Sequence, residues 1–458
     1  MTVDVGRLPE DALLAFVTAQ RWFGAKTREP VGMRLLDQAV LRKEAPVVVD
    51  ALAEIRYDAG AHEVYQLLIG LRERETGHAE AVIAALDGWS GYDALTDSAA
   101  ARELVHLVRR GASLPAQEGT LEFHTLDAIP PDSAAVLSVR PLGLEQSNTS
   151  VVLDDELIVK AYRRLEAGPN PELELLAFLT RHGFANVPAL HGWWAYSGPV
   201  MDATLGIVQR YVPGSVDGWT LALRELDAEP ERFLGRLRRL GEVVGSMHST
   251  LASDVDDPAF APEEPSAETL AILTATLDEQ IESVFQQLPD LPVLAPIAGR
   301  ADEVRDFLGS LSHFGPLGRV IRHHGDLHLA QALWADGDWT IVDFEGEPAR
   351  TLPERRRKRS PLRDVAGMLR SFAYAASAIP GAPRTFEQRA REEFLTAYRG
   401  AVQSANVLPD DETAADRLTL IFELEKAVYE LGYELNNRPD WVAVPVASIA
   451  RLLEAPAT

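Results

Sequence analysis

The sequence contains no cysteine among its 458 residues. Disulfide bonds, thiolate nucleophiles and cysteine-ligated zinc sites are therefore excluded. Basic residues are also scarce, because 44 Lys and Arg stand against 69 Asp and Glu, which gives a formal net charge of −25. Such a surface repels nucleic acid and anionic membranes, so we expect neither as a partner.

Long apolar runs are missing as well. No stretch reaches the roughly 20 apolar residues that a membrane-spanning helix needs. The N-terminus carries Asp4, Glu10 and Asp11 and lacks the basic start and apolar core of a signal peptide. The apolar fraction of 46% is ordinary for a protein with a buried core. We therefore expect a cytoplasmic protein, and the lack of cysteine suits a reducing compartment.

Strand patterns dominate the first half of the chain. An amphipathic helix over 10–20 is followed by strand-like runs at 46–49 and 64–69. Further strands are expected at 136–139, 150–153, 157–162 and 205–212. A helix is expected over 171–182, where Asn170 is a good N-cap and Pro171 suits the first helical position.

Helix patterns dominate the second half, at 232–251, 267–287, 303–311, 386–405 and 413–436. A β-rich front and an α-rich back predict an α+β fold with two lobes. We place a cap subdomain at 1–90, a β-rich N-lobe at 91–212, and an α-helical C-lobe at 213–458.

Carboxylates stand in two short segments, with Asp326 in the first and Asp343 and Glu345 in the second. Phosphoryl transfer needs a carboxylate that orients the attacking hydroxyl, and oxygen ligands for Mg²⁺. Asp326 suits the first task. Asp343 and the amide oxygen of Gln331 suit the second, and Glu345 would reach a second metal ion or act through water. The plainer alternative is that these residues cap turns.

Histidines surround Asp326. We expect His324 and His328 to brace the loop through hydrogen bonds to the backbone. The alternative is the metal site of a hydrolase, built from His323, His324, Asp326 and His328. Adjacent histidines point apart on an extended loop, however, and a hydrolase would leave the upstream lysine and the second carboxylate segment without a use.

That upstream lysine is Lys160, on the expected strand over 157–162. A lysine on an apolar strand is costly to bury unless it is paired. Glu172 and Glu174 stand at the start of the next helix, and an ion pair of Lys160 with Glu174 would aim the ammonium at nucleotide phosphates. The alternative is that Lys160 extends to solvent at the end of the strand.

Glycine-rich phosphate-binding motifs of the Walker and Rossmann types are absent. The segment before the lysine strand instead holds Ser147, Asn148 and Thr149, whose hydroxyl and amide groups could contact phosphates. By itself this segment is also typical of a polar turn.

Together these segments resemble the aminoglycoside-phosphotransferase-like kinases, relatives of the eukaryotic protein kinases. The family pattern H-G-D-x-x-x-x-N appears at 324–331 with Gln331 in place of Asn, and D-F-E/D appears at 343–345. Longer stretches, at 21–24, 145–151, 343–348, 360–372, 426–430 and 437–441, are similar to the actinobacterial maltokinase branch.

The resemblance implies a bilobal protein-kinase-like fold with an extra N-terminal cap, and ATP and Mg²⁺ as cofactors. It implies transfer of the ATP γ-phosphate to the anomeric hydroxyl of maltose, giving maltose 1-phosphate for α-glucan and glycogen synthesis. Asp326 matches the catalytic aspartate, Gln331 and Asp343 match the metal ligands, and Lys160 with Glu174 matches the phosphate lysine and its partner. The hinge, whose backbone would pair with adenine, corresponds to Gln209, Arg210, Tyr211 and Val212.

The sugar pocket is expected to involve the C-terminal helix, where Tyr429 and Tyr433 are one turn apart. Aromatic rings suit the apolar faces of sugar rings, although both tyrosines could instead pack in the core. Besides Asp326 and His328, the residues expected in this pocket are Tyr429, Glu430, Tyr433, Asn437, Arg438 and Trp441.

Other acceptors and roles remain open at this point. An acidic pocket would favour a cationic amino sugar such as glucosamine, phosphorylated at its 6-hydroxyl. A regulatory kinase fold without activity is a further alternative. The basic run at 355–359 would guide ATP or dock an acidic partner such as trehalose synthase, while the plainer interpretation is a solvated loop.

Overall fold

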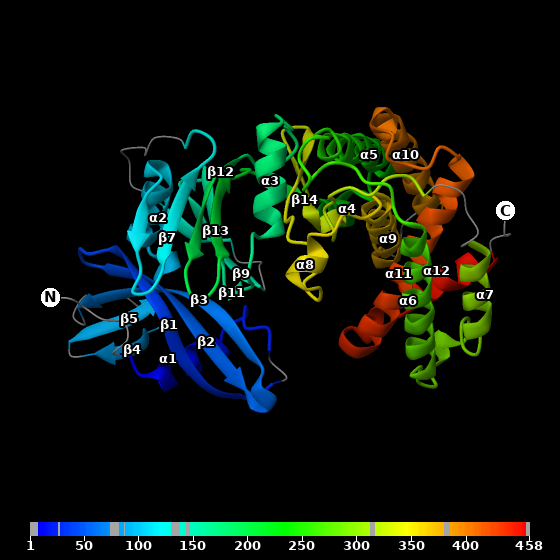
Figure 1. Ribbon diagram of the computed structural model, residues 1–458. Helices are drawn as coiled ribbons and strands as arrows, with labels where there is room; N and C mark the ends of the chain where they lie inside the picture. The colour runs from blue at the N-terminus through cyan, green and yellow to red at the C-terminus, as the bar shows by residue number, and fades with distance from the viewer. Residues whose placement is uncertain are drawn as a thin grey trace. The chain divides into compact units, whose positions relative to one another are not determined.

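The computed structural model describes residues 8–25, 28–73, 82–86, 88–129, 138–142, 147–311, 317–379 and 385–454. The chain folds into two compact units, one of Met1–Thr180 with Pro188–Pro213 and the other of Arg181–Val187 with Gly214–Thr458. Strands prevail in the first unit and helices in the second (Figure 1). The domain boundaries placed at 90 and 212 stay predictions.

Two antiparallel sheets form most of the first unit. The first has the order β1-β2-β3-β5-β4, and β11 also pairs with β3. Its strands are β1 (Pro30–Arg42), β2 (Val47–Tyr57), β3 (His62–Glu73), β4 (Val82–Leu86), β5 (Trp89–Asp93) and β11 (Arg164–Leu165). The second has the order β6-β7-β12-β13-β10-β9-β8. Its strands are β6 (Ser113–Pro115), β7 (Thr120–Thr125), β8 (Val139–Pro141), β9 (Asn148–Leu153), β10 (Leu157–Tyr162), β12 (Leu190–Ser197) and β13 (Ala203–Arg210).

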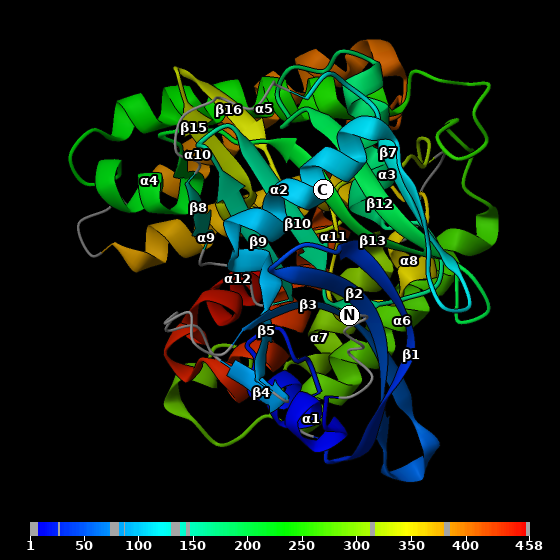
Figure 2. The same ribbon diagram turned by 90° about the vertical axis from the view of Figure 1, so that its left-hand side faces the viewer.

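Three α-helices belong to the described part of the first unit. They are α1 (Glu10–Thr18), α2 (Ser98–Arg110) and α3 (Pro171–Arg181). Helix α1 packs on the first sheet and α2 packs on β7 and β12 of the second (Figure 2). Asn170 Oδ1 accepts the backbone N–H of Glu172 at 2.8 Å, so α3 begins at the predicted cap.

The motif at 21–24 is part of the core of the first sheet. The rings of Trp22 and Phe23 are buried, and each lies 5.8 Å from the ring of Tyr65. The guanidinium of Arg163, between β10 and β11, lies 5.1 Å from the Trp22 ring and 2.7 Å from the Asp93 carboxylate. Because Arg163 follows a strand of the second sheet, these contacts join the two sheets into one unit.

The second unit is mainly helical, with one small sheet of order β14-β15-β16. Its strands are β14 (Val216–Asp217), β15 (Ala332–Ala335) and β16 (Asp338–Ile341). Its α-helices are α4 (Gly218–Glu225), α5 (Pro230–Leu251), α6 (Ala267–Gln286), α7 (Ala301–Leu311), α8 (Leu352–Arg355), α9 (Leu362–Ala378), α10 (Phe386–Val402), α11 (Glu412–Asn437) and α12 (Ala443–Glu454).

Close backbone contacts give this unit its packing. A Cβ atom at Gly241 of α5 would lie 2.3 Å from the carbonyl oxygen of Phe394 in α10. A Cβ atom at Gly367 of α9 would lie 2.6 Å from the carbonyl oxygen of Leu327. Glycine at position 367 therefore lets the segment with Asp326 rest directly on α9.

The predicted helices are confirmed, with ends that agree within three residues. Helix α10 ends at Val402, three residues before the predicted end. The predicted strands at 64–69, 150–153 and 157–162 lie within β3, β9 and β10. Of the strand predicted at 136–139, residues 136 and 137 lie outside the described residues. No helix in the described part of the chain is both long and apolar enough to cross a membrane.

The prediction of a solvated loop for the basic run at 355–359 fits Arg357, which is exposed, but it is wrong for Lys358 and Arg355. Lys358 donates to the carbonyl oxygens of Pro258 and Ala261, each at 2.7 Å, and Arg355 donates to the carbonyl of Glu345 at 3.1 Å. These hydrogen bonds hold the two basic side chains against backbone carbonyls of the same unit. The segment is therefore tied to the rest of the second unit.

Candidate active site

One buried carboxylate, that of Asp364, holds the backbone of the segment 323–328. Asp364, in the first turn of α9, accepts the backbone N–H groups of His324 at 2.8 Å and Gly325 at 2.9 Å. Nε2 of His248 lies 3.1 Å from the same carboxylate, and Nδ1 of His248 lies 3.0 Å from the Tyr398 hydroxyl. Burial raises the pKa of Asp364, but its histidine neighbours lower it further, so the carboxylate is ionised and anchors the loop.

His324 braces the loop, as the sequence predicts. Its Nδ1 accepts the backbone N–H of Asp326 at 3.3 Å, and its Nε2 donates to the carbonyl of Val342 at 2.9 Å. Both ring nitrogens are therefore engaged, and neither is free to bind a metal ion. This geometry argues against the histidine site of a hydrolase.

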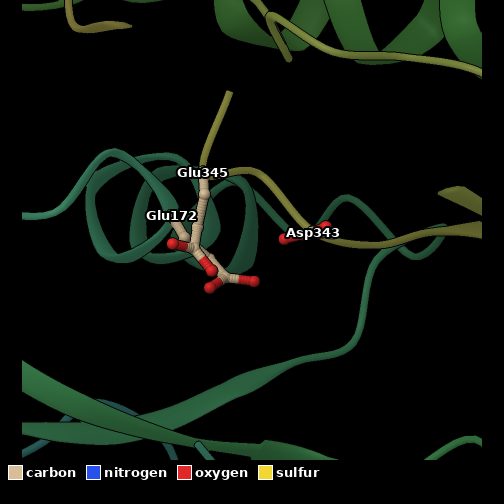
Figure 3. Close-up of side chains that lie close together, drawn as sticks. All are labelled: Glu172, Asp343 and Glu345. Carbon is tan, nitrogen blue, oxygen red and sulfur yellow. The ribbon is translucent and has the colours of Figure 1, made fainter. Parts of the chain in front are cut away.

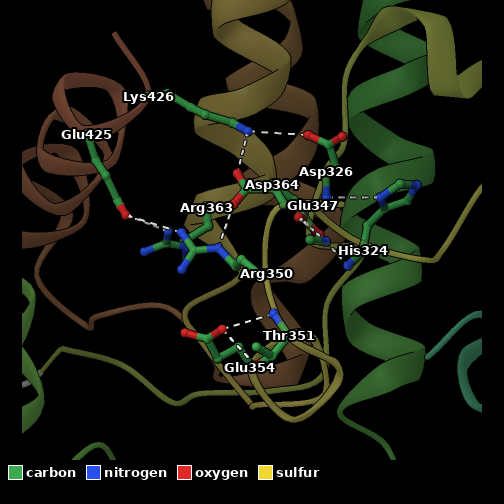
Figure 4. Close-up of polar contacts among 11 residues, drawn as sticks. His324, Asp326, Glu347, Arg350, Thr351, Glu354, Arg363, Asp364, Glu425 and Lys426 are labelled. Atoms are coloured by element: carbon green, nitrogen blue, oxygen red, sulfur yellow. Dashed lines mark hydrogen bonds and ion pairs between the residues drawn. The ribbon is translucent and has the colours of Figure 1, made fainter. Parts of the chain in front are cut away.

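The carboxylate of Asp326 lies beside the ammonium group of Lys426. Lys426 of α11 places its Nζ 3.3 Å from Asp326 Oδ1 and 2.7 Å from Glu347 Oε1 (Figure 4). Burial raises the pKa of Glu347, but the charges of Lys426 and Arg350 outweigh it and hold this pKa at about 2. Asp326 Oδ2 makes no hydrogen bond within the described part of the chain, and Asp326 lines a cavity.

The predicted metal ligands lie together in the second unit. Gln331 Nε2 donates to Asp343 Oδ2 at 2.9 Å, which leaves Gln331 Oε1 for other partners. Carboxylate oxygens of Asp343 and Glu345 come within 4.8 Å of each other (Figure 3). Asp343 has a φ of 65°, a conformation that non-glycine residues rarely adopt outside functional sites and turns. An all-oxygen set of two carboxylates and an amide fits Mg²⁺.

Lys160 is buried and paired, but the ion pair joins Nζ to Glu172 Oε2 at 2.9 Å, which corrects the prediction of Glu174. The Tyr162 hydroxyl donates to the same carboxylate at 2.9 Å. Successive helical residues turn by about 100°, so Glu172 and Glu174 point about 200° apart around α3. Since Glu172 faces β10, Glu174 points away from this strand.

The predicted hinge and phosphate segment are described within the first unit. The backbone N–H groups of Arg210 and Tyr211 donate to the carbonyls of Ala189 at 2.9 Å and Glu156 at 2.7 Å. An adenine would therefore have to use other backbone groups of this segment, which includes Gln209 and Val212.

In the phosphate segment, Thr149 Oγ1 accepts a hydrogen bond from Arg163 at 2.8 Å, which gives Thr149 a structural role. Ser147 is exposed, and its Oγ accepts a hydrogen bond from Asn148 at 3.2 Å. Both stay predictions as phosphate ligands, while residues 145 and 146 lie outside the described residues.

A cavity of about 510 Å³ opens beside Asp326, entirely within the second unit. This volume suits a small-molecule ligand. Every residue predicted for the sugar pocket except Asn437 lines it. The side-chain amide of Asn437 instead donates to the carbonyl of Tyr433 at 2.8 Å and closes the end of α11. Their role in binding a sugar stays a prediction.

The walls of the cavity combine rings and paired charges. Tyr429 and Tyr433 are 49% and 44% exposed, with ring centroids 6.4 Å apart, so the alternative of core packing is wrong for both. The Trp441 ring stacks on Tyr374 at 5.7 Å. Burial lowers the pKa of His328, which keeps its ring neutral beside Asp326.

Glu430 of α11 lines the cavity and has one carboxylate oxygen available for a ligand. Its Oε2 accepts both Nε and Nη2 of the buried Arg370, at 2.9 and 2.6 Å. Its Oε1 accepts no hydrogen bond within the part of the chain that the structure describes. In Glu434, by contrast, both carboxylate oxygens accept hydrogen bonds from Arg438, at 2.9 and 2.5 Å.

Reasoning from the sequence missed four residues of this site: Asp364, Glu347, Arg370 and Lys426. All four fall in or directly beside stretches that resemble the maltokinase branch, yet none carries a role in the short motifs. Their partners come from distant segments, so spacing alone could not assign them.

His323 gives the fold a dependence on pH. Its ring is buried and burial lowers its pKa to about 3, well below the usual 6.5. The unfolded chain therefore binds one more proton than the folded chain between these two values, and stability falls as the pH drops through this window. We expect His323→Gln, measured by urea unfolding from pH 7 to 4, to flatten the slope by about one proton. An unchanged slope would show that other groups cause it.

Two family models match the chain. The maltokinase N-terminal cap domain matches residues 16–97, and the phosphotransferase enzyme family matches residues 138–398. The second match spans more than half of the chain and contains the segments with Lys160, Asp326 and Asp343.

Among curated proteins, the chain is similar to two glucosamine kinases. The one from Streptacidiphilus jiangxiensis is 29% identical over 416 residues, which cover 82% of this chain and 89% of the relative. The one from Mycolicibacterium smegmatis is 28% identical over 333 residues, which cover 69% of this chain and 79% of the relative.

Among solved structures, a glucosamine kinase in complex with glucosamine, ADP and inorganic phosphate aligns with a TM-score of 0.71 and 21% identity. The alignment covers 99% of this chain and 100% of that one. A likeness at this identity concerns the fold, and it confirms the predicted α+β kinase-like fold with an N-terminal cap.

Proposed function

Because this chain belongs to the phosphotransferase enzyme family, we propose that it is an ATP-dependent kinase of a small amino sugar, with glucosamine as the favoured acceptor. Glucosamine thereby stands ahead of maltose, the acceptor that the resemblance of the longer stretches to the maltokinase branch implies. The similarity to two glucosamine kinases over most of the chain supports this order.

The observation that carries the proposal is the pattern of spare carboxylate oxygens in the cavity. Asp326 Oδ2 and Glu430 Oε1 both lack a partner in the described residues, while the cations of the cavity are already paired with carboxylates. A neutral sugar offers only hydroxyl groups to these oxygens. An amino sugar also offers an ammonium group, whose hydrogen bonds to a carboxylate are about twice as strong as neutral ones.

In the proposed reaction, Asp326 orients a hydroxyl of the acceptor. The acceptor oxygen forms a bond to the γ-phosphorus of ATP while the bond from this phosphorus to the β,γ-bridging oxygen breaks, and ADP leaves with that electron pair. The hydroxyl proton passes to Asp326, as expected for a general base. Lys160, aligned by Glu172, would neutralise phosphate charge.

Asp343, Glu345 and Gln331 would hold Mg²⁺. The ion would neutralise charge on the phosphate oxygens during transfer. These three residues reach their positions through the 12-residue spacing between Gln331 and Asp343 and the hydrogen bond that joins them.

An acceptor screen tests the proposal. With ATP and Mg²⁺, we expect kcat/KM for glucosamine to exceed that for glucose, N-acetylglucosamine and maltose by at least about tenfold, the effect of about 1.4 kcal/mol. Loss of the ammonium explains the difference for glucose, and its acetylation explains it for N-acetylglucosamine. Two-dimensional ³¹P–¹H NMR of the product identifies the phosphorylated hydroxyl.

Glu430→Gln sharpens the same test. The amide keeps the size of the side chain and removes its charge, so glucosamine turnover should fall about tenfold or more while glucose turnover changes little. Equal losses for both sugars would assign Glu430 only to holding Arg370.

Maltose is the second candidate acceptor. The match of residues 16–97 to the maltokinase N-terminal cap domain and the exposed pair of Tyr429 and Tyr433 favour it. The product would then be maltose 1-phosphate, for α-glucan synthesis, and a complex with trehalose synthase would follow. Maltose turnover above glucosamine turnover in the screen would decide for this candidate.

A further inference from the structure

Lys426 is a half-buried cation between two carboxylates that come from different segments of the chain. Its Nζ lies 2.7 Å from Glu347 and 3.3 Å from Asp326, and its side chain is 23% exposed (Figure 4). The pocket residue Tyr429 also faces it, with the ring centroid 6.0 Å from Nζ.

The charge of Lys426 persists at any working pH. Burial lowers its pKa, but the charges of Asp326 and Glu347 outweigh burial and raise it above the usual value. Glu347 is held from its other side by Arg350, whose Nε lies 2.5 Å from Glu347 Oε2. The shorter contact is thus to Glu347, and the longer one is to Asp326.

We propose that Lys426 is a positioning residue for Asp326, an inference that rests on the proposed function. By holding Oδ1, it leaves Oδ2 directed to the acceptor hydroxyl, and its charge stabilises the ionised carboxylate that takes the proton. Glu347 opposes this effect, because it draws the ammonium toward itself and adds a negative charge next to Asp326. Removing the charge of Lys426 and removing the charge of Glu347 should therefore act on the ionised carboxylate of Asp326 in opposite directions.

The other groups around Asp326 do not duplicate this role. His324 accepts the backbone N–H of Asp326 through Nδ1 and does not contact its carboxylate, and the ring of His328 is kept neutral by burial. Asp364 contacts the backbone of the loop. Among the described residues, Lys426 is the cation that touches the carboxylate of Asp326.

Two substitutions should move the acid limb of the pH profile in opposite directions. Lys426→Met removes the positive charge, and we expect the acid limb of kcat/KM to move up by about one pH unit. Glu347→Gln removes the negative charge and should move the limb down. At the pH optimum, Lys426→Met should lower kcat roughly a hundredfold with little change in the KM for ATP, because a misplaced base affects the reaction and not nucleotide binding.

Lys426→Arg and Lys43→Met are the controls. Arginine keeps the charge, so it should restore most of kcat and the position of the acid limb. Lys43 is exposed in the first unit, and its loss should change neither. The proposal is overturned if the acid limb does not move in Lys426→Met. It is also overturned if the limb moves in the same direction, and equally far, in Lys426→Met and in Glu347→Gln. If Lys426→Met does not fold, the downward shift in Glu347→Gln decides alone.

Failure of the proposed function gives a different result. In that case the wild-type protein phosphorylates no sugar of the screen, whatever residue 426 is. Crystal structures of the wild type and of Lys426→Met then test the positioning by themselves. A displaced Asp326 carboxylate in the variant supports the role of Lys426, and an unchanged one overturns it.

Discussion

Asp326→Asn is expected to lower kcat for glucosamine by about three orders of magnitude while the KM for ATP stays within about twofold. The amide keeps the size of the side chain and its hydrogen bond to the acceptor, but it cannot take the hydroxyl proton. Steady-state kinetics with ADP release as the readout measure both constants. The loss falls on kcat because the interaction matters most in the transition state.

Asp336→Asn is a matched control for this substitution. Asp336 is exposed in the turn between β15 and β16 with a φ of 51°, a conformation that asparagine tolerates well. It carries the same chemical change in the same unit, away from the cavity, and should leave kcat unchanged. Full activity in Asp326→Asn would remove Asp326 from the role of base and favour a regulatory kinase fold.

Asp364→Asn is expected to have the second largest effect, on stability and activity together. The carboxylate accepts two backbone N–H groups and contacts His248, and it is almost fully buried. An amide offers one acceptor oxygen and turns N–H groups toward donors, so at least one buried donor loses its partner. The cost is about 3 kcal/mol, which lowers Tm by roughly 6 to 10 °C for a unit of this size.

The activity of Asp364→Asn should fall together with its stability, because the N–H groups that Asp364 anchors belong to His324 and Gly325, directly before Asp326. Differential scanning calorimetry and kinetics at 15 °C, where the variant remains folded, separate the two effects. Tyr398→Phe is the graded control, since it removes only the hydroxyl that contacts His248 and should cost about 1 kcal/mol. A variant Asp364→Asn with unchanged Tm would show that the loop holds its shape without this anchor.

Short-range patterns in the sequence were enough for the elements and the motifs. Helix α3 begins where Asn170 and Pro171 predict, because a cap acts within one turn of the chain. Asp326, Gln331 and Asp343 could be singled out because a loop, a short strand and a second loop place them at a fixed spacing. The absence of cysteine excluded whole classes of chemistry before any contact was known.

Partner choice was decided by the tertiary structure. The sequence offered Glu172 and Glu174 to Lys160, and only the rotation of α3 selects Glu172. Lys426 stands 100 positions after Asp326, and Lys358 of the basic run finds a carbonyl partner at Pro258, 100 positions before it. Spacing along a chain carries no information about which side chains meet across such separations, because that depends on how whole helices pack. The lack of cysteine and the excess of acid thus limited what this protein could be, while the pairing of its few buried cations with carboxylates shaped the site itself.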